Sequence, residues 1–177
     1  MKHENLRRHI HDDVLWENVL RRFKYAAVQL DHSKEVKARA RSGYYQAAAM
    51  YLASIVEAHL HVLLSKAQKE GKCLPCMGRH QDYTQLPKKF FGDDIYVCRK
   101  KREPMKIMKN TDLKDVIDCC NEMQLISIKL AKKCHRVRNI RNQIHIMGRQ
   151  KRELSHTQEN IDHIGAVIDA LASLLQK

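Results

Sequence analysis

Residues 44–64 read YYQAAAMYLASIVEAHLHVLL, and no other stretch says more about the architecture of the chain. The apolar residues of this stretch lie around most of the circumference of a helix, not along one stripe. A helix of that kind must be covered on several sides, either by neighbouring helices or by a second subunit. We therefore expect a long second helix, from about residue 35 to residue 69, inside a helical bundle.

Amphipathic helical repeats stand on both sides of this segment. A first helix is predicted by apolar residues that recur every three or four positions, namely Leu6, Ile10, Val14, Trp16, Leu20, Phe23, Ala27 and Leu30. The same rhythm returns from Val116 to Met147, where one long helix or two helices in near register would produce it, and again from Ile161 to Leu175. The sequence thus predicts an all-α protein, an up-and-down bundle of four to five helices in a single domain spanning residues 1–177.

Residues 71–110 interrupt the helical pattern between the second and third helices. All three prolines of the chain fall in this stretch, together with three glycines. Residues 95–98, Ile-Tyr-Val-Cys, are followed by the basic residues 99–102, which together are consistent with one arm and the turn of a small hairpin. Because long unstructured loops are uncommon in compact domains, we expect an irregular insertion or inserted subdomain here.

The formal net charge of +13, in a chain with 11 histidines, favours a polyanionic partner. Nucleic acid is the first such partner to consider and an anionic membrane surface the second; a solvated basic surface is the simpler alternative. The first nine residues lack the apolar core of a secretory signal. The chain contains no run of 18 apolar residues, so the sequence predicts no transmembrane span. We therefore expect a cytoplasmic protein without a membrane partner.

The segment most informative about function is Arg138-Asn139-Ile140-Arg141-Asn142-Gln143-Ile144-His145. On a helix, Arg138, Arg141, Asn142 and His145 share one stripe opposite the apolar residues, so they are predicted to point away from the core. A histidine can move a proton to or from a ribose hydroxyl, an arginine can bind phosphate oxygens, and an asparagine can orient either. This set requires no metal or other cofactor. The alternative is an ordinary solvated helix face.

This segment resembles the motif of the HEPN family (higher eukaryotes and prokaryotes nucleotide-binding), in which an arginine is followed after four to six residues by a histidine. Arg138-Asn139 with His145 fits the six-residue form, whereas Arg141-Asn142 leaves three residues before His145. The resemblance implies a helical bundle, a homodimer with two facing motifs, and a metal-independent endoribonuclease acting by 2′-hydroxyl attack. Many such proteins are toxins or defence proteins, which would add an antitoxin or regulatory protein as a partner.

Two other groups of residues have alternative interpretations. Cys73, Cys76, His80 and Cys98 could form a Cys₃His zinc site, but free thiols in a loop are the simpler interpretation, and we predict no metal. On the second helix, His59 is expected to be a buried histidine. Glu57 and His61, one turn apart, are expected to pair locally, with Glu57 able to assist the site.

Three functional hypotheses follow from the sequence. The first is a dimeric ribonuclease, with His145 in proton transfer, Arg138 and Arg141 on phosphate and Asn142 in an orienting role. The second is a non-catalytic relative that binds RNA or a nucleotide on the same basic face. The third is a helical scaffold that docks another protein through residues 44–64. The apolar surface of that segment is also the sequence argument for a homodimer.

Overall fold

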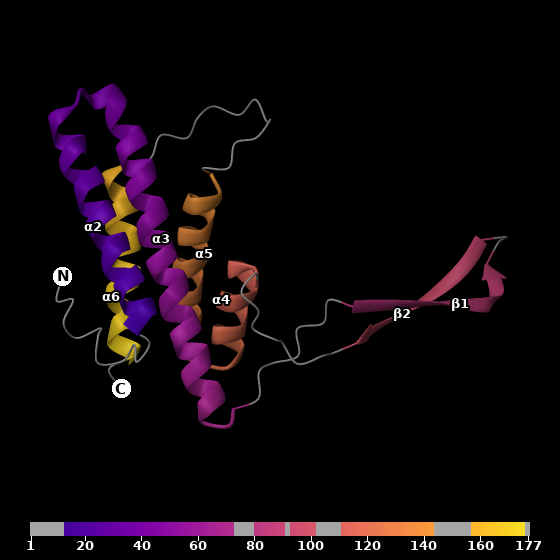
Figure 1. The fold of residues 1–177 in the computed structure, drawn as a ribbon. Helices are drawn as coiled ribbons and strands as arrows, with labels where there is room; N and C mark the ends of the chain where they lie inside the picture. Colours follow the sequence, from indigo (N-terminus) through magenta and orange to yellow (C-terminus); the bar gives the residue numbers. More distant parts are fainter. Residues whose placement is uncertain (1–12, 73–79, 91–92, 102–110, 144–156, 176–177) are drawn as a thin grey trace.

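The computed structural model describes residues 13–72, 80–90, 93–101, 111–143 and 157–175 (Figure 1). In chain order these form the helices and strands α2 (Asp13–Glu35), α3 (Ala38–Lys69), β1 (His80–Phe90), β2 (Asp93–Lys101), α4 (Leu113–Glu122), α5 (Ile128–Asn142) and α6 (Gln158–Leu175). The predicted all-α bundle is confirmed, with a strand pair inserted between its second and third predicted helices.

Helix α3 is the centre of the bundle, and α2, α4, α5 and α6 all pack against it (Figure 1). Its middle is buried on several sides, at Ala48, Ala49, Leu52, Ala53, Ile55, Val56, His59, Leu60, Leu63 and Leu64. Neighbouring helices of the same chain therefore cover much of the apolar surface of residues 44–64, with Met50 still 41% exposed. That surface no longer argues for a second subunit, and the homodimer remains a prediction.

The same helix meets the length and composition of a membrane span over Ala40–Lys69. In the fold, 56% of the 18-residue stretch of this helix that meets the criterion is buried inside the protein. A core helix surrounded by other helices has this composition for the same reason that a membrane helix does, because both are in apolar contact around most of their circumference.

The apolar rhythm after residue 110 belongs to two helices, α4 and α5. Asp112 caps α4, and its side chain accepts a hydrogen bond from the backbone N–H of Lys114. The helix ends where Gln124 adopts φ 58°, and the N–H of Leu125 reaches back to the carbonyl of Cys120 at 2.9 Å. This is the geometry of a Schellman C-cap. Ser127 then caps α5 by accepting from the N–H of Leu130 at 3.2 Å.

Within residues 71–110, the described part is an antiparallel hairpin whose strands pair from His80 with Lys101 to Phe90 with Asp93. The small hairpin is therefore confirmed, but the basic residues do not form its turn. Residues 99–101 continue β2, because the strands are joined between Phe90 and Asp93. The register shifts between Gln85 and Lys89, around Pro87, whose nitrogen has no hydrogen to donate to the ladder.

Candidate functional site

The residues of the predicted site lie on the last turns of α5, the most basic helix of the bundle. Residues 128–142 contain six Lys or Arg and no Asp or Glu. Arg138, Arg141 and Asn142 lie within this helix, whereas His145 lies outside the described residues. The structure therefore places three of the four predicted site residues on one helix end.

Arg141 does not point away from the bundle as its sequence position predicted. Its Nη1 donates to Oε2 of Glu57 on α3 at 3.0 Å, and the two side chains are 35% and 27% exposed. The reason lies seven residues earlier in α5. Cys134 is fully buried and stands two turns below Arg141, so this face of the helix continues from the core toward α3.

Arg138 likewise lies two turns after a buried residue, Ala131, on the same face of α5. Its side chain is half-buried, and its Nη2 donates to Oδ1 of Asn139 at 3.2 Å. Its Nε is buried without a hydrogen-bond partner among the described residues. Arg138 therefore lacks the carboxylate partner that Arg141 has, within the part of the chain that the structure describes. Asn142 is exposed, as predicted.

Glu57 and His61 stand one turn apart on α3, but the carboxylate of Glu57 is directed to Arg141. Burial lowers the pKa of His61 below the usual histidine range, and the nearby charge of Glu57 partly opposes this shift. The expected local pair is thus an electrostatic contact, and Glu57 is the residue that links α3 to the basic end of α5.

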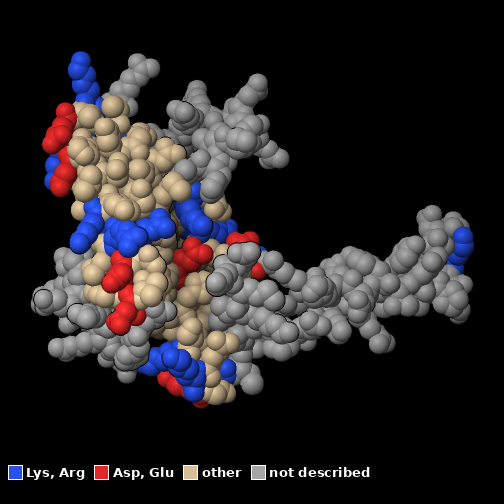
Figure 2. Space-filling model, in the orientation of Figure 1, with Lys and Arg blue, Asp and Glu red and all other residues tan. Residues whose placement is uncertain are grey.

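A second feature, not identified from the sequence, is an aromatic and basic cluster on α2 and α3. The guanidinium of Arg22 lies 5.7 Å from the ring centre of Tyr51, whose ring is 5.4 Å from that of Tyr25. Tyr25 is 47% exposed. Figure 2 shows Lys and Arg side chains across the middle of the face drawn there, with Asp and Glu side chains directly below them. The spacing of Arg22 and Tyr25 on one helix was the available signal, but their contact with Tyr51 is tertiary.

The zinc alternative stays open. There is no group of three His, Cys, Asp or Glu that could hold a metal ion among the described side chains, and those of His80 and Cys98 do not belong to that set. Cys73 and Cys76 lie outside the described residues. In the hairpin, His80 is the register partner of Lys101 and Cys98 that of Tyr83. These two residues are therefore not opposite each other in the ladder.

Comparison of the chain with protein-family models, with curated proteins and with solved structures gives no match. Membership of the HEPN family accordingly stays a prediction. It rests on the motif of residues 138–145 and on the helical architecture.

Proposed function

We propose that the protein is a metal-independent endoribonuclease of HEPN type that is active as a homodimer and serves as a toxin or defence protein. The observation that supports it best is the pair of half-buried arginines at the end of α5. Arg141 is oriented by Glu57, and Arg138 has no carboxylate partner among the described residues. A guanidinium without a carboxylate partner is ready to bind a phosphate.

In the proposed reaction, the ribose 2′-oxygen attacks the adjacent phosphorus and the 5′-oxygen of the next nucleotide leaves. The 2′-hydroxyl loses a proton and the leaving 5′-oxygen gains one; His145 makes one of these two transfers, and water makes the other. Arg138 binds the non-bridging oxygens as their charge develops, with Arg141 beside it and Asn142 orienting the substrate or the imidazole. The products are a 2′,3′-cyclic phosphate and a 5′-hydroxyl, and no metal is needed for the balance.

Single-stranded RNA is the proposed substrate class. The exposed ring of Tyr25, next to Tyr51 and Arg22, offers a surface on which an unpaired base can stack. On α3, Tyr51 precedes Glu57 by six residues, a rise of about 9 Å. The six positions also turn the helix by about 120°, so the two residues lie on different sides of α3, and an RNA bound to both the aromatic cluster and the arginines would have to cross this helix.

Cleavage of labelled RNA in EDTA tests the enzyme. We expect cyclic-phosphate ends from RNA and no cleavage of DNA, which lacks the 2′-hydroxyl. His145→Ala should lower the rate by about 10²–10⁴, whereas His32→Ala, at an exposed histidine of α2, should not change it. Arg138→Ala should reduce cleavage more than Arg141→Ala, because Glu57 already neutralises Arg141. Equal RNA degradation by wild type and the His145 variant would exclude the enzyme.

The second candidate is a non-catalytic protein that binds RNA or a nucleotide on the same face. It is favoured by the six Lys and Arg residues of α5, a helix without an acidic residue of its own, because this charge does not depend on His145. Fluorescence anisotropy with a single-stranded RNA separates the two functions, since this candidate predicts salt-sensitive binding without turnover. Absence of both binding and cleavage would favour a protein scaffold instead.

A further inference from the structure

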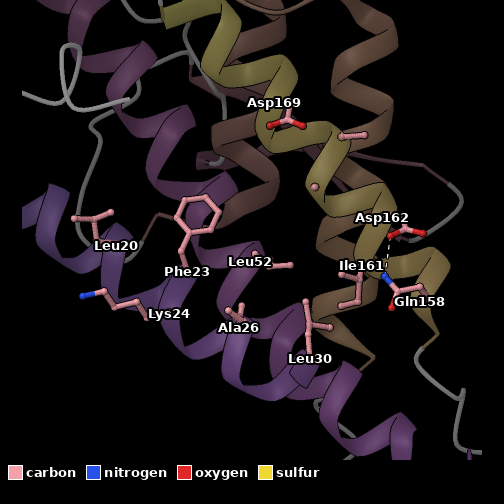
Figure 3. Close-up of a pocket in the computed structure, with 13 residues that line it drawn as sticks. Leu20, Phe23, Lys24, Ala26, Leu30, Leu52, Gln158, Ile161, Asp162 and Asp169 are labelled. Carbon is pink, nitrogen blue, oxygen red and sulfur yellow. Dashed lines mark hydrogen bonds between the residues drawn. The ribbon is translucent and has the colours of Figure 1, made fainter. Parts of the chain in front are cut away.

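On another part of the bundle, away from the arginines of α5, a groove runs between α2 and α6, with α3 beneath it (Figure 3). Its volume is about 680 Å³. The floor is apolar, and Figure 3 shows Leu52 of α3 lying between Phe23 of α2 and Ile161 of α6. These three side chains are 3–8% exposed, so they form the narrow base of the groove, and the more exposed apolar side chains of its walls are those of Leu20, Ala27, Leu30 and Ala166.

Small residues line both walls of the groove, at Ala27 of α2 and at Gly165 and Ala166 of α6. A Cβ built on Gly165 would meet no atom within 4 Å. Glycine is unfavourable inside a helix, and nothing in the described part of the chain occupies the space that its missing side chain leaves. The opening therefore permits the backbone of another element to approach α6 closely.

The α6 rim of the groove is acidic although the chain as a whole is strongly basic. Residues 158–175 contain three acidic residues and no Lys or Arg, against a net charge of +13 for the whole chain. Asp162 and Asp169 both line the groove and are both exposed. They stand seven residues apart on the same side of α6, a rise of about 10 Å. Lys24 lies on the opposite wall.

We propose that this groove docks an amphipathic helix of a partner protein, with its apolar stripe bordered on one side by Lys or Arg about two turns apart. The apolar stripe would pack against Leu20 and Leu30 of α2 and Ala166 of α6, above the buried base of the groove. The basic edge would face Asp162 and Asp169. Helices bind apolar grooves through side chains at such i, i+3, i+4 and i+7 spacing. Nucleic acid does not fit here, because its phosphates would meet the carboxylates of α6. The site is independent of the proposed ribonuclease function.

The test uses the full chain and a fluorescein-labelled 18-residue peptide of Leu, Ala and Lys, with Leu along one stripe and Lys along one edge. A matched peptide carries Glu in place of every Lys. We expect the Lys peptide to bind at least about tenfold more tightly than the Glu peptide. In the Glu peptide, the two attractive Lys–Asp pairs are replaced by two repulsive Glu–Asp pairs. The double variant Asp162→Asn, Asp169→Asn should remove that preference, and Glu122→Gln, at an exposed residue of α4, should keep it.

Gly165→Leu places a side chain in the groove and should weaken binding of the Lys peptide by about tenfold or more. Gly165→Ala, whose Cβ has free space, should weaken it less, and circular dichroism of both variants reports whether α6 is intact. Equal binding of the two peptides, or unchanged binding by folded Gly165→Leu, would overturn the proposal. So would a wild-type dimer that Gly165→Leu converts to monomer, because the groove would then contact a second copy of the chain. RNA cleavage by Gly165→Leu should equal that of wild type.

Discussion

Arg141 at the end of α5 and Glu57 in the middle of α3 form an ion pair across 84 residues of sequence, with Nη1 and Oε2 at 3.0 Å. The pair fixes the direction of one arginine of the proposed site. It also removes most of the charge that this arginine could offer to a phosphate. The two arginines of the motif are therefore not equivalent, although their sequence positions are similar.

Glu57→Gln should loosen Arg141 and expose its charge. We expect a loss of about 0.2–1 kcal/mol in the free energy of unfolding, the usual range for a partly exposed ion pair. The affinity for single-stranded RNA should rise, and the dependence of log K on log salt should steepen by close to one phosphate contact. Chemical denaturation and fluorescence anisotropy at several salt concentrations measure these effects.

Glu159→Gln is the matched control. Glu159 of α6 pairs at 2.8 Å with Arg136, which lies on α5 as Arg141 does, but Glu159 is 78% exposed. Both variants raise the net charge by one. If they change the salt dependence of RNA binding equally, the change reflects net charge alone, and Arg141 has no special place in the RNA site.

Two glycines of the described residues, Gly165 and Gly71, lead to opposite predictions for substitution by alanine. Gly165→Ala should stabilise α6 by about 1 kcal/mol, because alanine has the higher helix propensity and the added Cβ meets nothing. For a chain of this size that corresponds to a rise in Tm of about 2–4 °C. Gly71→Ala should lower Tm, because Gly71 closes α3 with φ 77°, where an L side chain is strained. Thermal unfolding by circular dichroism checks both; a Tm change of the same sign would contradict this account.

Most of the fold follows from local patterns in the sequence. The continuous apolar surface of residues 44–64 predicts the buried α3. Thr111 and Asp112 are both suitable N-cap residues before the apolar rhythm, and Asp112 is the one that caps α4. The sequence did not distinguish one long helix from the two helices α4 and α5, because two helices in phase give the same apolar spacing as one. The break depends on the left-handed backbone at Gln124, where the sequence has no glycine to mark it.

The candidate site was less predictable, for two physical reasons. The direction of Arg138 and Arg141 was inferred from nearby Val137 and Ile140, but the buried face of α5 also includes Ala131 and Cys134, which are small and contribute little to an apolar pattern. The partner of Arg141 lies on another helix, so no local spacing contains it. The groove is likewise a property of the distance between α2 and α6 and not of either sequence.

Three cysteines of the core should be unreactive in the folded protein. Burial raises the pKa of Cys119 to about 11 and that of Cys134 to about 12, and it raises that of Cys120 as well. At pH 8 only about a thousandth of Cys119 would be thiolate, and the thiolate is the species that reacts. Iodoacetamide followed by mass spectrometry should label these residues in denaturant but not in native buffer. Rapid labelling of any of them in the native protein would show that the core opens readily.

His59 should make the fold sensitive to acid. The side chain is 0% exposed, and its Nδ1 lies 2.7 Å from the carbonyl oxygen of Ile55. Because that oxygen can only accept, the ring donates from Nδ1 and leaves Nε2 buried without a partner among the described residues. Protonation of Nε2 would bury a charge, and this desolvation lowers the pKa of His59, with the bond to Ile55 opposing it.

The folded pKa of His59 is therefore below the ordinary value of 6.5 that applies to the unfolded chain. Its contribution to stability is complete above pH 6.5 and is lost as the pH falls toward the folded pKa, by about 1.4 kcal/mol for each pH unit in that window. The free energy of unfolding from urea titrations should be lower at pH 5.5 than at pH 7.5. His59→Leu should reduce this difference, whereas His32→Gln, at an exposed histidine, should not. Burial lowers the pKa of His61 as well, so part of the acid sensitivity should persist in His59→Leu. An acid-induced loss of the same size in His59→Leu and wild type would mean that the buried imidazole is not its source.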